Sequence, residues 1–278
     1  MSIVQINKNM LTKTIKEIVM SEKGLKTGYK VLDERINGLQ KGAFYVLGGR
    51  PAMGKTTFAM NIAYHLAVKQ NKKVLYVSFD MSKRRVITRL LRMDCGIDLE
   101  RLQGKLINEQ LMQKLSTSIN HLGQAPICLE DAPGFTVEAL VMALRDNMEL
   151  NKVQLVVIDY LQLMSCDREF ETRQEEISYI CLQLKNIAKE LNISIMAISA
   201  LSRAVEQRPD HRPLLSDLRE SGGIEQYADV VMFLYREEYY DAEPISKGNT
   251  EIIVSKNLYG PIGIVKLTFS DKYMLYKE

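Results

Sequence analysis

The stretch that decides the fold is AFYVLGGRPAMGKTTFAMNIAYHLAV, residues 43–68. Its first seven residues form an apolar run that predicts a buried β-strand, and the residues from Lys55 onward have the pattern of a helix. Between them, GRPAMGKT at residues 49–56 has the GxxxxGK[ST] spacing of a phosphate-binding loop. In such a loop, backbone amides surround phosphate oxygens and the following helix points its N-terminus at them.

The spacing also predicts a role for each part of the loop. We expect Lys55 to reach the outer phosphates of a nucleotide and Thr56 to face a magnesium ion. Gly49 and Gly54 would allow the backbone to approach the phosphates closely. A chance match to the pattern is the alternative, but the strand before the loop and the helix after it argue against one. The predicted nucleotide-binding residues of the loop are Gly49, Arg50, Pro51, Ala52, Met53, Gly54, Lys55, Thr56 and Thr57.

The composition indicates a globular chain without a membrane segment. Of the 278 residues, 46% are hydrophobic, which is enough for the core of one large α/β domain or two small ones. No run of about 18 apolar residues occurs, so we expect no membrane role. The formal net charge of +3 is too small to indicate a nucleic-acid partner by itself. The four cysteines are scattered without a CxxC pair, which predicts reduced thiols, a cytoplasmic setting and no zinc site.

Apolar runs alternate with helical patterns through the rest of the chain. Because continuous apolar strands separated by helices are typical of parallel sheets, the sequence predicts an α/β fold with a mainly parallel twisted sheet and helices on both faces. The tail differs, since TEIIVSKN and GIVKLTFSD flank a Gly-Pro turn and predict a C-terminal antiparallel hairpin at the sheet edge. The predicted strands are AFYVLGG, VLYVSFD, PICLED, LVVIDYLQLM, ISIMAISAL and ADVVMFLYR, and helices are expected from Lys55, from about Ser82 to Gln113, from about Val137 and from about Arg173 to Leu191.

The N-terminal residues form a separate segment. Residues 9–21, NMLTKTIKEIVMS, carry apolar side chains at helical spacing and predict an amphipathic helix. Such a helix could lie on its own domain or dock on a second subunit, and the residues themselves leave both possibilities open. We therefore divide the chain into an N-terminal segment, residues 1–23, and one α/β domain, residues 24–278.

An acidic residue is expected beside the loop. LVVIDY places Asp159 after four apolar residues, at the end of a predicted buried strand. In nucleotide hydrolases with this type of loop, a carboxylate at such a position orients magnesium. A purely structural aspartate is the alternative, but a buried carboxylate is costly unless it is paired or close to a metal. We therefore expect Thr56 and Asp159 to form the metal site.

Hydrolysis also needs a group that orients the attacking water. The strand VLYVSFD ends with Asp80, and in this topology the tip of that strand lies beside the phosphate loop. Asp80 is therefore the candidate base, and it joins Lys55 as a predicted catalytic residue. The alternative role is an N-cap for the helix that begins near Lys83, because aspartate is favoured at that position.

The stretch SRAVEQRPDHRPLLSDLRESGG, residues 202–223, lies between two predicted strands and carries four arginines and four acidic residues. Because it contains no aromatic side chain, it offers no platform for base stacking, and a nucleic acid would contact it through phosphate oxygens. Arginine side chains and the amides of residues 221–223 would make those contacts. A solvated surface loop is the alternative, and composition alone leaves both interpretations open.

Several motifs together resemble the C-terminal motor domain of the DnaB family of replicative DNA helicases. They occur in order and with matching spacing over about residues 24–278. Among them, SDLRESGGIEQYADVV is far more specific than any phosphate loop. The motifs are TGYKVLDERINGLQKG, GGRPAMGKT, VIDYLQLM, RQEEISYICLQLKNIAKELN, RPLLSDLRESGGIEQYADVVMFLYREEYY and the SK..YGPIG tail.

The resemblance implies a RecA-like P-loop fold, ATP and Mg²⁺ as cofactors, and movement along single-stranded DNA through the channel of a six-membered ring. The ATP sites would lie between neighbouring subunits, with Lys256 reaching a neighbour's phosphates and residues 9–21 in the position of the family's linker helix. The residues predicted to bind DNA are Arg203, Arg219, Glu220 and Gly222, the last three through their match to LRESGG.

Three positions depart from the family pattern near the expected outer phosphate. Asp80 stands where the family carries a glutamate, Ala200 where it carries a phosphate-sensing glutamine, and Leu258 where it carries an arginine finger. An arginine finger can contribute about 10³–10⁵-fold to the rate, so its loss is expected to weaken hydrolysis more than the shorter carboxylate does. Lys256 or Arg236 could substitute for the finger.

Two functions are consistent with these residues. The first is an ATP-dependent DNA helicase motor of the replicative type, assembled as a ring of identical subunits. The second is a hydrolysis-poor relative that binds ATP and regulates or joins a replicative helicase, for example in a mixed ring. A recombination-type RecA relative is a third interpretation, which the LRESGGIEQ stretch disfavours.

Overall fold

The computed structural model describes residues 24–98, 108–146, 152–218, 222–240 and 248–278. The amphipathic helix predicted for residues 9–21 lies outside these ranges, so that expectation stays a prediction. No helix within the described ranges is long and apolar enough to cross a membrane.

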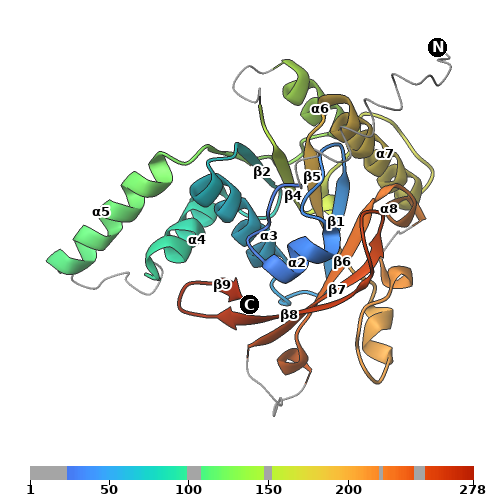
Figure 1. The fold of residues 1–278 in the computed structure, drawn as a ribbon. Helices are drawn as coiled ribbons and strands as arrows, with labels where there is room; N and C mark the ends of the chain where they lie inside the picture. Colours follow the sequence, from blue (N-terminus) through green and yellow to red (C-terminus); the bar gives the residue numbers. More distant parts are fainter. Residues whose placement is uncertain (1–23, 99–107, 147–151, 219–221, 241–247) are drawn as a thin grey trace, which may run out of the picture.

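A nine-stranded sheet runs through the molecule (Figure 1), in the order β3-β2-β4-β5-β1-β6-β7-β8-β9. The pairings from β3 to β6 in that order are parallel, and those from β6 to β9 are antiparallel. The mainly parallel sheet and the C-terminal hairpin, β7 with β8, are therefore confirmed. The strands are β1 Phe44–Gly49, β2 Val74–Ser78, β3 Ile127–Asp131, β4 Leu155–Asp159, β5 Ser194–Ala200, β6 Val230–Tyr235, β7 Asn249–Asn257, β8 Gly263–Ser270 and β9 Leu275–Lys277.

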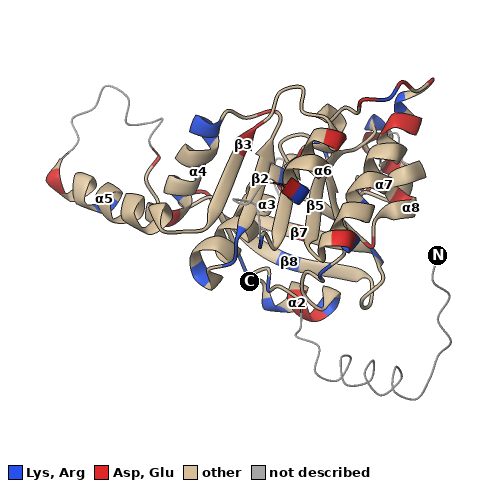
Figure 2. Ribbon diagram, turned by 90° about the horizontal axis from the view of Figure 1, so that it is seen from above, with Lys and Arg blue, Asp and Glu red and all other residues tan. Residues whose placement is uncertain are grey.

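The central strands present alternate residues to two separate cores. In β1, Tyr45 and Leu47 pack with α2, α3 and α4, whereas Phe44 and Val46 pack with α6, α7 and α8. This follows from strand geometry, in which successive side chains point to opposite faces. Figure 2 shows α6 and α7 on one side of the sheet and α2 and α3 on the other. The helices are α2 Lys30–Ile36, α3 Lys55–Tyr64, α4 Lys83–Cys95, α5 Glu109–Gly123, α6 Val137–Asp146, α7 Arg173–Leu191 and α8 Gly222–Tyr227.

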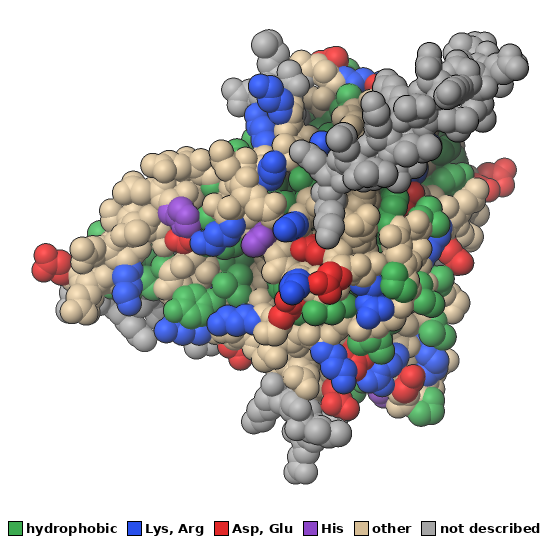
Figure 3. Space-filling model, in the orientation of Figure 1, with side chains coloured by type: hydrophobic (Ala, Val, Ile, Leu, Met, Phe, Trp, Pro, Cys, Tyr) green, Lys and Arg blue, Asp and Glu red, His purple; other side chains and the backbone are tan. Residues whose placement is uncertain are grey.

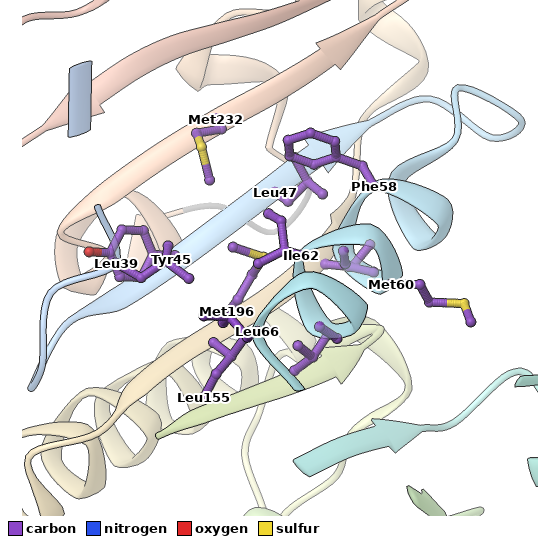
Figure 4. Packing of buried hydrophobic residues seen from close by; sticks show 14 of the residues in the cluster. Leu39, Tyr45, Leu47, Phe58, Met60, Ile62, Leu66, Leu155, Met196 and Met232 are labelled. Atoms are coloured by element: carbon purple, nitrogen blue, oxygen red, sulfur yellow. The ribbon is translucent and has the colours of Figure 1, made fainter. Parts of the chain in front are cut away.

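The helix that follows the phosphate loop is fixed by the first of these cores. Figure 4 shows Phe58 and Ile62 of α3 and the adjoining Leu66 directed toward the sheet, where they meet Leu47 and Leu155 among others. All five side chains are fully buried. Burial of a side chain of this size typically contributes about 1.5–3 kcal/mol, so α3 and the loop at its N-terminus are held firmly against the strands.

The helical stretch predicted from about Ser82 to Gln113 contains α4 and the start of α5 but is not continuous. α4 ends because Gly96 follows it in the left-handed conformation, at φ 71°, which glycine adopts without strain. A second helix, α5, begins after Asn108, whose side chain accepts a hydrogen bond from the Leu111 amide at 2.9 Å. Residues 99–107 between the two helices lie outside the described ranges. Gly96 was the available signal, since glycine commonly ends helices.

The sequence pattern did not predict β9. This short strand pairs antiparallel with β8. Its Tyr276 ring meets Phe58 of α3 edge-on at 5.5 Å and Phe269 of β8 at 4.9 Å, measured between ring centroids. The C-terminal strand therefore packs directly on the helix that follows the phosphate loop.

Candidate nucleotide-binding site

The phosphate loop is a tight turn between β1 and α3. The Met53 amide donates to the Arg50 carbonyl at 3.3 Å, and Ala52 has a positive φ of 64°. Gly54 is the N-cap of α3, so the helix begins at Lys55 with its N-terminus at the loop. The first amides of a helix have no partner within the helix and carry partial positive charge, which makes this end of α3 suited to phosphate.

The protein's own packing leaves little room for a side chain at the two glycines of the loop. Gly54 has a φ of 95°, and a Cβ there would overlap the hydroxyl oxygen of Tyr276. A Cβ on Gly49 would lie 3.1 Å from the Leu234 carbonyl oxygen. Besides the predicted approach of a phosphate, the glycines therefore also allow the close approach of β6 and of Tyr276 of β9.

The remaining loop residues differ in how far they are buried. Pro51 and Ala52 are exposed, whereas Met53 and Thr57 are 1% and 6% exposed. The Met53 side chain belongs to the hydrophobic core below the loop. Any contact that Met53 makes with a phosphate would therefore come from its backbone.

Lys55 is held inside the loop by a backbone contact. Its Nζ donates to the Arg50 carbonyl oxygen at 3.0 Å. Burial lowers the pKa of Lys55 to about 8, although the nearby Asp159 carboxylate acts in the opposite direction. An ammonium group that has lost much of its hydration is stabilised by a phosphate oxygen, which would raise its pKa again.

Asp159 lies at the end of β4, and its carboxylate is held by two hydroxyl groups. Thr56 Oγ1 donates to Oδ1 at 3.2 Å and the Tyr76 hydroxyl donates to Oδ2 at 2.8 Å. Asp159 is only 3% exposed, and burial raises its pKa despite these hydrogen bonds. A hydroxyl and a carboxylate side by side are the oxygen donors that Mg²⁺ prefers, so the pair predicted as a metal site fits that ion. Tyr76 carried no motif and was missed.

Asp80 is an exposed residue just beyond the end of β2. The preceding residue, Phe79, donates its amide to the Asp159 carbonyl at 2.8 Å, which ties this turn to the end of β4. After burial, the charge of Asp80 also contributes to raising the pKa of Asp159, which indicates that the two carboxylates lie near each other. The alternative role of Asp80 as an N-cap is wrong, because Ser82 occupies the N-cap of α4.

Lys256 and Leu258 lie away from the loop of their own chain, because β6 separates β7 from β1. Lys256 Nζ donates to the Glu225 carbonyl at 2.6 Å and caps the end of α8. Leu258, just after β7, is 64% exposed. The predicted reach of Lys256 to a neighbour's phosphates therefore requires the side chain to leave α8.

A cation–aromatic pair lies beside the loop and was also missed. The Arg236 guanidinium, after β6, sits 5.0 Å from the centroid of the Phe269 ring of β8. Phe269 in turn packs on Tyr276, whose hydroxyl reaches Gly54. Flat faces of this kind suit a nucleotide base. No sequence spacing links these residues, since the sheet order brings them together.

Ion pairs hold residues 202–218 of the 202–223 segment against the sheet. Asp217, only 2% exposed, accepts from Arg208 Nη1 at 2.8 Å. Arg212 makes two hydrogen bonds to Glu251 of β7, at 3.0 and 3.1 Å. These contacts hold residues 202–218 in place, although many of their side chains are exposed to solvent. Arg203 is exposed on it, Gly222 is exposed at the start of α8, and Arg219 and Glu220 lie outside the described residues.

The segment contains no Phe, Tyr or Trp, as the sequence shows, but the fold places aromatic side chains of other elements beside it. Arg212 lies over the Tyr235 ring at 4.8 Å, and the His211 ring stacks on Tyr240 at 4.2 Å between centroids. Tyr239, next to Tyr240, is 46% exposed. These tyrosines belong to β6 and the residues after it, so the aromatic surface comes from outside residues 202–223.

A parallel sheet with this loop after β1 and an acidic residue at the end of β4 defines a P-loop nucleotide-binding protein. Comparison with known proteins gives the particular family. The model of the DnaB-like helicase C terminal domain matches residues 24–278, and the chain belongs to this family. The resemblance drawn from the motifs is confirmed.

Curated relatives of the chain include replicative DNA helicases. It is 39% identical over 251 residues to the replicative DNA helicase DnaC of Bacillus subtilis (strain 168), and 40% identical over 252 residues to the replicative DNA helicase DnaB of Geobacillus stearothermophilus. Each match covers 90% of this chain and 55% of the relative, so the chain spans about half the length of these proteins.

Two solved structures share the fold, each with a TM-score of 0.90, 35% identity and coverage of 97% of this chain. One is an isolated ATPase domain, of which 97% is covered. The other is a DnaB-like replicative helicase described with its interactions with primase, of which 68% is covered. Together with the sheet order, these matches confirm the predicted RecA-like P-loop fold.

Proposed function

We propose that this chain is the ATP-driven motor of a replicative-type DNA helicase and moves along single-stranded DNA. The observation that carries the proposal is the meeting of Thr56 and Asp159 at the N-terminus of α3, with a hydroxyl–carboxylate distance of 3.2 Å. Lys55 lies in the same loop with a pKa lowered to about 8 by burial. A phosphate-binding helix end, a buried cation and an oxygen donor pair suit a magnesium nucleotide.

Each residue then has a defined task in hydrolysis. Lys55 would contact the outer phosphates, while Thr56 and Asp159 would hold Mg²⁺. When bound, the ion neutralises negative charge on the phosphates as the terminal P–O bond breaks. Asp80 would orient the water that attacks the terminal phosphorus and accept its proton. The exposure of Asp80 supports this role, since the water must reach it from solvent.

The nucleotide base would use the cation–aromatic pair. Arg236 and Phe269 lie 5.0 Å apart, measured from the guanidinium carbon to the ring centroid, beside the loop. Both the Arg236 guanidinium and the Phe269 ring are planar. An adenine ring could therefore stack on either group. This would place ATP between the phosphate loop after β1 and the antiparallel edge of the sheet.

Single-stranded DNA would bind at the 202–223 segment through its phosphates. Arg203, Arg219, Glu220 and Gly222 are the residues we propose for this contact. On the face seen in Figure 3, Lys and Arg side chains are interspersed with Asp and Glu. Because the formal net charge of the chain is only +3, we expect a few positioned groups to contact the DNA phosphates. The curated relatives are named as replicative DNA helicases, which supports this partner.

The working assembly would be a ring, of identical subunits or mixed with a replicative helicase, in a cytoplasmic setting. Residues 1–23 would form the linker segment and residues 24–278 the ATPase domain. In the ring, Lys256 would leave the Glu225 carbonyl and approach a neighbour's phosphates, whereas the exposed Leu258 offers no charge. We therefore expect slow hydrolysis for a motor of this family.

The direct test measures ATP turnover with and without single-stranded DNA, beside the Lys55→Ala variant. Turnover stimulated by DNA, and lower in the variant by about 10²–10³-fold, supports the motor. If the chain binds ATP tightly but turns it over no faster than Lys55→Ala, the motor proposal is wrong and an ATP-binding regulator takes its place.

A further inference from the structure

Arg50, the first residue of the turn after β1, joins the phosphate loop to the candidate DNA segment. Its side chain is 12% exposed. Nε and Nη2 donate to the same Glu206 carboxylate oxygen, at 3.0 and 2.8 Å, and Nη1 donates to the Leu201 carbonyl at 3.0 Å. Glu206 lies 156 positions further along the chain, in a 3₁₀ turn of residues 203–207.

The same residue is bonded to the lysine that would meet the nucleotide. The Arg50 carbonyl accepts from Lys55 Nζ at 3.0 Å. A triphosphate in the loop attracts the Lys55 ammonium, because phosphate oxygens are charged acceptors and a carbonyl is not. Nucleotide binding would therefore draw Lys55 from the Arg50 backbone and change the position of the arginine whose side chain holds Glu206.

The hydrogen bond from Arg50 to the Leu201 carbonyl lies where residues 202–218 begin. The strand bridge between Leu201 and Leu218 brings the two ends of residues 202–218 together, and the Ser202 amide donates to the Asp217 carbonyl at 2.8 Å. A shift of Leu201 would therefore reach Leu218 directly, and the predicted DNA-binding residues Arg219 and Glu220 come next in the chain.

The end of β5 offers no equivalent side chain in this protein. Ala200, where the family's glutamine would stand, ends in a methyl group and cannot bond to a phosphate. Its amide donates to Gln162 Oε1 at 3.0 Å, and Gln162 Nε2 donates to Ser199 Oγ at 2.8 Å. Both ends of the Gln162 amide are thus used in holding the strand end together.

We infer that the Arg50–Glu206 ion pair couples occupancy of the phosphate loop to the conformation of residues 202–218, in place of the missing glutamine contact. Glu206 acts here as a positioning residue, since it works through Arg50 and Leu201 and is assigned no contact with nucleotide or DNA. The inference rests on the proposed function, because it needs both ligands to bind to this chain.

The experiment measures the affinity of the full chain for a fluorescein-labelled oligothymidylate with and without AMP-PNP and Mg²⁺. The ratio of the two dissociation constants is the coupling factor, and coupled sites typically differ by about 5–150-fold. We expect at least about a fivefold ratio for the wild type and a ratio below about twofold for Glu206→Gln. The affinity for AMP-PNP without DNA should stay within twofold, about 0.4 kcal/mol, in that variant.

The matched control is Glu190→Gln. Glu190 makes a comparable two-bond ion pair with Arg145, at 2.8 and 2.6 Å, between α7 and α6. It should leave the coupling factor unchanged. Glu206→Asp, which keeps the charge on a shorter side chain, should retain part of the coupling, which a purely structural role would not predict.

A second measurement keeps the test decisive if Glu206→Gln is less stable. Hydrogen exchange of residues 202–218 should change when AMP-PNP binds to the wild type and stay unchanged when it binds to the variant. Coupling in Glu206→Gln equal to that of the wild type overturns the inference. A wild type that binds both ligands without coupling also overturns it but leaves the proposed function intact, whereas failure to bind AMP-PNP contradicts the proposed function itself.

Discussion

The phosphate loop and residues 202–218 lie next to each other but are stabilised by different interactions. Buried apolar packing supports the loop, since Met53 and the residues of α3 below it belong to the hydrophobic core. The segment instead depends on charged side chains, through Arg208 with Asp217 and Arg212 with Glu251. One region has a fixed shape, and the other is held by contacts that water and salt weaken.

This difference indicates a division of labour. Close-packed cores have low compressibility, so the loop and Asp159 keep the geometry that phosphate chemistry needs. A partly exposed ion pair such as Arg212 with Glu251 contributes little and is weakened by salt, whereas the pair that contains the buried Asp217 contributes more. A segment held partly by exposed ion pairs can change shape more easily than the loop, and the proposed motor would need this property in the element that contacts DNA. Arg50 is the residue that contacts both regions.

The largest expected effect comes from removing the charge of Asp159, which lies beside the rigid phosphate loop. Asp159→Asn keeps the shape and an acceptor for the Tyr76 hydroxyl but loses the charge that would hold Mg²⁺. We expect ATP turnover to fall about 10³-fold while DNA affinity stays unchanged, measured by steady-state hydrolysis and fluorescence anisotropy. The control is Asp131→Asn at the end of β3, two strands from β4, where turnover should stay within twofold. A tenfold or smaller loss in Asp159→Asn would contradict the assignment.

A smaller effect is expected from Asp217→Asn in residues 202–218. Loss of the pair with Arg208 should weaken binding of oligothymidylate about tenfold and leave the AMP-PNP affinity unchanged, because the segment loses its shape while the loop keeps its core. The same variant should lower the free energy of unfolding by about 2 kcal/mol at neutral pH, measured in urea. Equal losses of both affinities would mean that the two regions form one unit.

The pH dependence of that variant follows from the Asp217 carboxyl. Burial alone would raise its pKa, but the hydrogen bonds from Arg208 and the Leu214 amide outweigh burial and lower it. A carboxyl with a depressed pKa in the folded state stabilises the protein above its ordinary value of about 4 and loses that contribution as the pH falls. The difference in the free energy of unfolding between wild type and Asp217→Asn should therefore reach its full value at pH 6 and become smaller below about pH 4. A constant difference would contradict a charged pair.

Most of the fold could be predicted from the sequence, because its signals are local. The strands are continuous apolar runs, and the loop residues from Gly49 to Thr57 are contiguous. Asp159 was found because a charge that ends a buried strand is rare without a reason. The helix break at Gly96 was missed, because apolar residues at helical spacing continue on both sides of the glycine.

The parts of the site that could not be predicted depend on strand order. Arg236, Phe269 and Tyr276 come from three antiparallel elements and meet only because β6, β7, β8 and β9 lie in that order beside β1. The Arg50–Glu206 pair joins residues 156 positions apart. No pattern of spacing or composition encodes such contacts, because they follow from the packing of the whole sheet.

The smallest expected effect concerns Arg203, an exposed residue of the segment 202–218. If its guanidinium contacts one DNA phosphate, Arg203→Ala should weaken oligothymidylate binding about three- to fivefold at physiological salt. The slope of log affinity against log salt should also fall by about 0.7, the value for one phosphate on a single strand. The AMP-PNP affinity should not change, because no atom of the loop depends on Arg203.

The matched control for this prediction is Lys114→Ala, an exposed cation on α5. Both variants lose one positive charge, so a general effect of net charge would lower the two affinities equally. A contact at Arg203 would instead lower the salt slope only in Arg203→Ala. Equal salt slopes in the two variants would exclude Arg203 from the proposed DNA site. DNA binding would then depend on the residues that follow Leu218.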